Sequence, residues 1–186
     1  ANRLTTLTRP DGTTFNYAYS ADGEKISETD SLGRVTRFEY SPIGLLTRTT
    51  YPDASFETMT YDTESRLVSK TNELGQTTNL EYDQLGRLLA TIDPSGVRWE
   101  SQFDSVGRKI ADKDPLNRVT AYQFNNLDRI TKVIRPDNSF VISSFDAVGN
   151  LLSTVDALGN QWTWVYDNLN RQVSAIQPNG ASSTTS

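Results

Sequence analysis

The residues best placed for acid–base chemistry are two aspartates close together, Asp112 and Asp114. A carboxyl pair does such work only when a pocket raises the pKa of one member. The 186 residues contain no histidine, which removes Ser-His-Asp and Cys-His catalysis and the commonest metal ligand. They contain no cysteine, glycine-rich phosphate loop or nucleophile elbow either. The sequence therefore predicts no catalytic residue, no cofactor and no metal, and an enzyme is the last of three hypotheses.

Three kinds of binding chemistry stay open beside that prediction. Recurring Asp and Gly suggest structural calcium, although their spacing fits neither an EF-hand nor a glycine-dense nonapeptide repeat. Trp99, Trp162 and Trp164 are candidates for a sugar-binding platform or for core packing, and packing is favoured. A periodic arginine series, including Arg66 and Arg108, can bind anions, stack on neighbouring aromatics or pair with carboxylates. An Asp that recurs at a turn start is best explained as a turn cap.

All these residues belong to an internal repeat of 21 residues, with no insertion or deletion. The anchor of each copy is an aromatic residue: Tyr19, Tyr40, Tyr61, Tyr82, Phe103, Phe124, Phe145 and Tyr166. An aspartate follows five of them: Asp62, Asp83, Asp104, Asp146 and Asp167. A glycine lies four residues after five of them: Gly23, Gly44, Gly86, Gly107 and Gly149. The repeat is thus the unit that positions every candidate side chain.

A second signal lies half a repeat later and resembles Asp-Pro-x-Gly. Its glycines are Gly12, Gly33, Gly75, Gly96, Gly159 and Gly180. The two signals account for all 11 glycines and all 7 prolines of the chain. Asp caps a turn, Pro presets φ, and Gly accepts a left-handed conformation, so both signals predict reverse turns. Ala54 and Ser65 occupy glycine slots and predict local strain or a different turn.

The five or six residues between successive turns match the length of a β-strand. Side chains alternate between the two faces of a strand. In the strand that leads to each anchor, the face that includes the anchor and the positions two and four residues before it holds 15 of the 18 aromatic residues. Leu88, Ile92, Ile130 and Ile134 share one parity in the alternate strand, which predicts one aromatic–aliphatic face and one polar face. We therefore expect an all-β fold, in which tandem 21-residue β-hairpins form one long antiparallel, curled or spiralling sheet, as in a shell wall or solenoid.

The amino-acid composition agrees with a β-sheet of a single layer. Hydrophobic residues make up only 35% of the chain and the mean hydropathy is −0.54. The net charge of −5 argues against nucleic acid, and no apolar stretch is long enough to span a membrane. We expect a repeat array over residues 1–180 and a polar tail over 181–186, in a fragment of a longer array.

The stretch Tyr82 to Gly96 resembles the YD-repeat, or Rhs-repeat, family, whose pattern is close to Tyr-Asp-x-x-Gly-Arg-Leu followed by Asp-x-x-Gly. The resemblance covers essentially the whole chain in eight registered copies. It implies a spiralling β-shell, which encloses a toxic domain in bacterial toxin complexes and Rhs toxins and forms part of an adhesion ectodomain in teneurins. Bacterial members often end in a segment whose aspartates release the toxin, and this sequence has no such segment.

The first functional hypothesis is therefore a structural segment of a secreted or cell-surface bacterial protein, part of a hollow shell that shields a toxic effector. The expected partners are neighbouring repeats, an encapsulated toxin domain and other copies joined through sheet edges. The alternative is an adhesion, carbohydrate-binding or fibre-forming repeat array.

Overall fold

A computed structural model of the chain describes residues 3–184. It contains two compact units, Ala1–Arg98 and Trp99–Ser186. Every regular element among the described residues is a β-strand, and no helix occurs there, so none that could cross a membrane. The prediction of an all-β fold built from tandem hairpins is confirmed.

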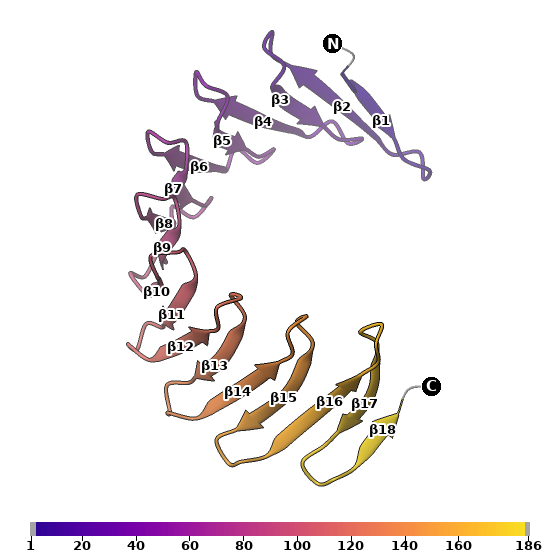
Figure 1. Cartoon of the computed structure of the whole chain (residues 1–186). Coiled ribbons are helices and arrows are strands. Elements are labelled where there is room, and N and C mark those ends of the chain that lie inside the picture. The colour runs from indigo at the N-terminus through magenta and orange to yellow at the C-terminus, as the bar shows by residue number, and fades with distance from the viewer. Residues whose placement is uncertain (1–2, 185–186) are drawn as a thin grey trace. The chain divides into compact units, whose positions relative to one another are not determined.

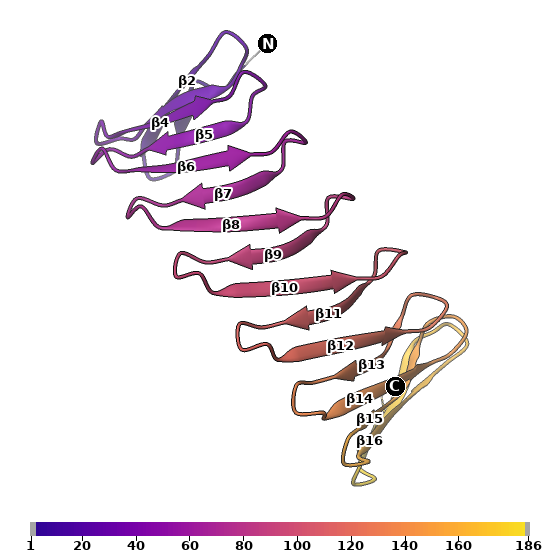
Figure 2. The same cartoon turned by 90° about the vertical axis from the view of Figure 1, so that its left-hand side faces the viewer.

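Each strand of the first unit pairs antiparallel with the next strand in the chain, from β1–β2 to β8–β9 (Figures 1 and 2). The strands are β1 (Thr6–Thr8), β2 (Thr14–Tyr19), β3 (Lys25–Thr29), β4 (Val35–Tyr40), β5 (Leu46–Thr50), β6 (Phe56–Tyr61), β7 (Leu67–Thr71), β8 (Thr77–Tyr82) and β9 (Leu88–Ile92).

The second unit repeats the same pattern of pairing, from β10–β11 to β17–β18. Its strands are β10 (Arg98–Phe103), β11 (Lys109–Lys113), β12 (Val119–Phe124), β13 (Ile130–Ile134), β14 (Phe140–Phe145), β15 (Leu151–Asp156), β16 (Gln161–Tyr166), β17 (Gln172–Ile176) and β18 (Ser182–Thr184). Strand β18 lies in the segment expected to be a polar tail, of which residues 185–186 lie outside the described residues.

Two kinds of turn join these strands. A first-type turn follows each anchor aromatic, which ends its strand, and a second-type turn lies half a repeat later. Both close through a hydrogen bond from the fourth residue to the first: Gly86 N donates to the Asp83 carbonyl (3.0 Å) and Gly96 N to the Asp93 carbonyl (2.9 Å). The fourth residue has positive φ in each, 80° at Gly86 and 82° at Gly96. In Figure 2 the two kinds of turn of the first unit lie at opposite edges of its sheet.

Ala54 and Ser65 form the same turn as the glycines, rather than a different one. Their φ values are 68° and 64°, and their N–H groups donate to the carbonyls of Tyr51 (3.0 Å) and Asp62 (3.1 Å). An L-residue with a Cβ is strained in the left-handed region. Local strain, one of the two expected outcomes, is therefore what the structure contains.

Replacing Ala54 with glycine is expected to stabilise the chain by a few tenths of a kcal/mol to about 1 kcal/mol, because glycine relieves that strain. Thermal unfolding measures the effect as a rise in Tm. The matched control is Ala18→Gly in β2, where the extended backbone gives glycine no advantage and Tm should fall. An unchanged or lower Tm for Ala54→Gly contradicts the prediction.

The sheet faces differ from the sequence expectation in one respect. Thr91 of β9 pairs with Leu80 on the aromatic face, whereas Ile92 pairs with Asn79 on the opposite face. A register shift between Glu81 and Tyr82 causes this, because one extra residue moves the rest of the short strand to the other face. The same shift precedes the anchor of every long strand from β2 to β16. The assignment of Ile92 and Ile134 to the aromatic face was wrong for this reason.

The sheet has one layer and little interior. Among the described residues, Ala90, Ala111 and Thr49 are the buried ones, and the anchor aromatics are half-buried. The solvent-accessible surface is 12321 Å², against roughly 8,900 Å² for a compact globule of this mass. Stability must therefore come from contacts between neighbouring hairpins.

Candidate functional site

Polar side chains make repeated hydrogen bonds at the turns, and the first-type turn that begins at Asp83 shows the pattern. The Asp83 Oδ1 atom accepts hydrogen bonds from the N–H groups of Leu85 and Arg87, both at 2.9 Å. Its Oδ2 atom accepts from the Arg87 guanidinium at 2.5 Å. The Arg87 N–H is the main cause that holds the pKa of Asp83 below its ordinary value, with the guanidinium also contributing. The Asp therefore caps the turn and orients the arginine four residues later.

The oriented arginine reaches the following repeat. Arg66 is held by Asp62 at 2.6 Å, donates from Nη1 to the Asp83 carbonyl at 3.0 Å, and places its guanidinium 5.1 Å from the centre of the Tyr82 ring. Equivalent ring contacts join Arg3 to Tyr19 (5.7 Å), Arg108 to Phe124 (5.0 Å) and Arg129 to Phe145 (5.3 Å). We call this set of Asp, Arg, next aromatic and next turn carbonyl the inter-repeat clamp.

Three tyrosine anchors within the sheet also donate a hydrogen bond to the backbone of the preceding hairpin. The hydroxyls of Tyr40, Tyr61 and Tyr82 donate to the carbonyls of Lys25 (2.9 Å), Leu46 (2.8 Å) and Leu67 (3.0 Å). In each case the acceptor is 15 residues earlier and begins the short strand. Phenylalanine anchors keep the ring but lack this bond. Sequence reasoning missed the link, although the choice of Tyr over Phe at an anchor was its signal.

The two aspartates considered for acid–base chemistry have different hydrogen-bond partners. Asp112, in β11, accepts from Ser101 Oγ (2.8 Å) and the Tyr122 hydroxyl (2.9 Å), whereas Asp114 caps a second-type turn with Arg118 at 2.6 Å. Desolvation acts to raise both pKa values, but these hydrogen bonds outweigh it, so both carboxyls have pKa values below the ordinary one. A general acid needs the opposite shift.

The residues considered for sugar, metal and anion binding do not come together as a binding site in the described part of the chain. Trp99 is on β10 and Trp162 and Trp164 are on β16, six strands or roughly 29 Å apart, so the three do not form one platform. Within residues 3–184 no group of three acidic side chains is arranged to hold a metal ion. The arginines stack on aromatics and pair with turn carboxylates, which are two of the three roles proposed for them.

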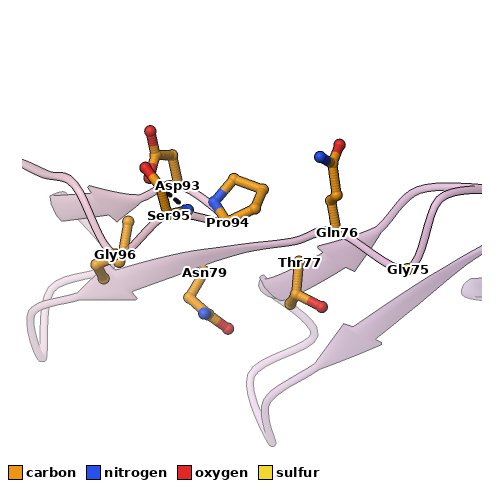
Figure 3. Close-up of a pocket in the computed structure, with 9 residues that line it drawn as sticks. Gly75, Gln76, Thr77, Asn79, Asp93, Pro94, Ser95 and Gly96 are labelled. Atoms are coloured by element: carbon orange, nitrogen blue, oxygen red, sulfur yellow. Dashed lines mark hydrogen bonds between the residues drawn. The ribbon is translucent and has the colours of Figure 1, made fainter.

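A groove lies between successive second-type turns of the first unit, lined by Gly75, Gln76, Thr77, Asn79, Ile92, Asp93, Pro94, Ser95 and Gly96. Figure 3 shows Gln76 and Pro94 on one side of the ribbon and Thr77 and Asn79 on the other. The Asp93 carboxylate is already bonded to the Ser95 hydroxyl at 2.6 Å and to the Val97 N–H at 2.9 Å. The polar groups do not converge on one point, so the groove lacks the arrangement of a ligand site.

Acid is expected to destabilise the protein through its turn carboxylates. The folded pKa is lowered at thirteen aspartates: Asp11, Asp30, Asp53, Asp62, Asp83, Asp93, Asp104, Asp112, Asp114, Asp137, Asp146, Asp156 and Asp167. A lowered folded pKa gives stability that is fully present above the unfolded pKa of about 3.9 and is lost as pH falls through the folded pKa. Tm should therefore fall steeply below about pH 4.

Asp83→Asn provides a matched control for this pH effect. Asn72 accepts the two backbone N–H bonds of its own turn without a charge, so asparagine preserves the cap. The variant should have a lower Tm at neutral pH and lose less of it in acid. A Tm that stays constant down to pH 3 in the unmodified chain contradicts the account.

The sequence profile described as RHS Repeat matches residues 19–55, 61–98 and 145–182, together more than half of the chain. The chain belongs to the RHS repeat family. The matched segments carry the clamp and both kinds of turn, and the resemblance inferred from the sequence is thus confirmed. No curated protein matches the chain in sequence.

Solved structures share the fold of this RHS repeat chain. The crystal structure of TcdB2-TccC3-Cdc42 aligns with a TM-score of 0.70 and 17% identity, over 88% of this chain and 10% of that one. A Tc holotoxin pore of Photorhabdus luminescens with a mutated TccC3 aligns with a TM-score of 0.63 and 13% identity, over 90% of this chain and 12% of that one. The chain spans about a tenth of these proteins, so the likeness concerns the repeat fold.

Proposed function

We propose that this chain forms part of the wall of a hollow β-shell that encloses and shields a toxic effector domain. The observation that supports the proposal most strongly is the inter-repeat clamp in a single-layer sheet. Arg66, Arg108 and Arg129 each contact the anchor ring and the turn carbonyl of the next repeat, as Arg66 does with Tyr82 and Asp83. Such a unit extends a wall by repetition and needs no second layer.

The low burial of the sheet suits that role. A wall must keep two accessible faces, whereas a globular domain buries a core, and within residues 3–184 no helix covers either face. The family and the Tc toxin structures of the same fold support a structural segment of a secreted bacterial toxin assembly. The partners are then the neighbouring repeats and the enclosed domain. The role is non-catalytic, since turn capping and the clamp occupy the repeated Asp and Arg side chains.

Cryo-electron microscopy of the protein as its own cells produce it tests the proposal. A repeat wall closed around an interior volume that contains further polypeptide supports encapsulation. A repeat array with both faces open to solvent and no enclosed polypeptide overturns it, and favours the adhesion or fibre-forming alternative.

A further inference from the structure

One asparagine of the chain has the neighbour that makes its side-chain amide reactive. Asn179 is the only asparagine in the sequence that a glycine follows, and both residues are exposed. They are the third and fourth residues of the second-type turn 177–180, which joins β17 to β18 (Figure 1). Gly180 has no Cβ to shield its backbone nitrogen from the Asn179 amide. This pair can therefore cyclise to a succinimide.

The reaction needs only water as a co-reactant. The Gly180 nitrogen attacks Asn179 Cγ, and the new N–Cγ bond replaces the bond from Cγ to Nδ2. The released Nδ2 group leaves as ammonia, with the proton of the Gly180 N–H. Water then opens the ring at Cγ, which gives aspartate, or at the Asn179 backbone carbonyl carbon, which gives isoaspartate. Either product carries one new negative charge.

The closed turn opposes the first step. The Gly180 N–H donates to the Gln177 carbonyl at 2.9 Å, and Asn179 Oδ1 accepts from the Ala181 N–H at 3.0 Å. Both reacting groups are thus held by hydrogen bonds, and the turn has little freedom to bring the nitrogen onto Cγ. The reaction must wait until the turn opens, so its rate is the equilibrium constant for opening multiplied by the rate in an unfolded chain.

The segment that contains this turn is joined to the preceding repeat without the arginine of the inter-repeat clamp. Asn150 occupies the position that Arg66 holds in its repeat, and its Nδ2 atom donates to Asn170 Oδ1 at 2.9 Å. Asparagine has no guanidinium to stack on the next anchor, Tyr166. In the described part of the chain, the Tyr166 hydroxyl also lacks the bond to a backbone carbonyl that Tyr82 makes. The segment from β16 to β18 is therefore the part of the second unit that the clamp stabilises least.

We propose that Asn179 is a spontaneous deamidation site and that opening of the segment from β16 to β18 controls its rate. The fold accepts one of the two products. Asp11 has the same position in the turn with Pro10 and Gly12, where its Oδ1 atom accepts from the Thr13 N–H at 3.0 Å. Isoaspartate instead adds a methylene carbon to the main chain, so the turn cannot close in the same way. Molecules that form isoaspartate therefore lose the register between β17 and β18.

Peptide mapping by mass spectrometry of the full chain, incubated in neutral buffer with and without urea, tests the proposal. Unfolding should raise the deamidation rate at Asn179 by about 10-fold or more, which corresponds to an opening free energy of at least about 1.4 kcal/mol. Gly180→Ala is the chemical control, because its methyl group crowds the attacking nitrogen and should slow the reaction in urea as well. Ala54 shows that this turn position accepts alanine, at a φ of 68°, and no atom lies within 4 Å of the Cβ position at Gly180.

A second variant tests the control by the segment. Asn150→Arg restores the clamp arginine opposite Tyr166 and should lower the deamidation rate without urea by about 2- to 5-fold, the effect of one exposed cation–π contact. The rate in urea should stay unchanged. The matched control is Leu45→Arg, which places an arginine at the same repeat position in the first unit and should leave both rates unchanged.

Equal rates with and without urea overturn the control by opening, and a lack of reaction at Asn179 in urea overturns the site itself. A rate without urea that Asn150→Arg leaves unchanged, or that Leu45→Arg lowers equally, overturns the role of the segment from β16 to β18. Thermal unfolding verifies that the variants are folded. The proposal concerns the chemistry of one turn and does not depend on the proposed role as a shell wall.

Discussion

Replacing Tyr82 with alanine is expected to lower the free energy of unfolding by about 2–3 kcal/mol, somewhat less than for a fully buried aromatic. The half-buried ring receives the Arg66 guanidinium on its face at 5.1 Å, and its hydroxyl donates to the Leu67 carbonyl at 3.0 Å. Alanine removes both the ring contact with the Arg66 guanidinium and the hydrogen bond to the Leu67 carbonyl. Equilibrium urea unfolding measures the loss.

Two conservative variants separate the ring from the hydroxyl. Tyr82→Phe keeps the ring and should cost about 0.5–1.5 kcal/mol, the usual contribution of one hydrogen bond. Phe124→Tyr adds a hydroxyl where the corresponding acceptor is the carbonyl of Lys109, and should recover part of that amount. If Tyr82→Ala costs no more than Tyr82→Phe, the ring has no role in joining the repeats.

Replacing Gly96 with valine is expected to cost about 1–3 kcal/mol, because a β-branched residue is strained at the φ of 82° that this turn requires. No atom lies within 4 Å of the position a Cβ would occupy, so the cost is conformational rather than steric crowding. The control is Gly96→Asn, which should cost far less, since Asn138 has a φ of 64° in another second-type turn. Equal losses in Tm for the two variants would show that backbone conformation does not explain the glycine.

The repeat made most of the fold predictable from the sequence. The turn preferences of glycine, proline and aspartate depend only on neighbouring residues in the chain. The turns at Asp83–Gly86 and Asp93–Gly96 could therefore be predicted from residue types alone. The arginine contacts were foreseen as alternatives, and Arg66 makes both the ion pair and the ring contact.

The sheet faces could not be derived in the same way. The register shift beside Tyr82 has no residue signature in the repeat, yet it moves Ile92 to the opposite face.

Small-angle X-ray scattering of the chain, extrapolated to zero concentration, tests the single-layer repeat sheet most directly. A compact globule of 186 residues has a radius of gyration of about 16 Å. The account predicts a clearly larger radius and a cross-section one sheet thick, roughly 10 Å. A radius near that of a globule, with a two-layer cross-section, would contradict both the single-layer sheet and its proposed role as a wall.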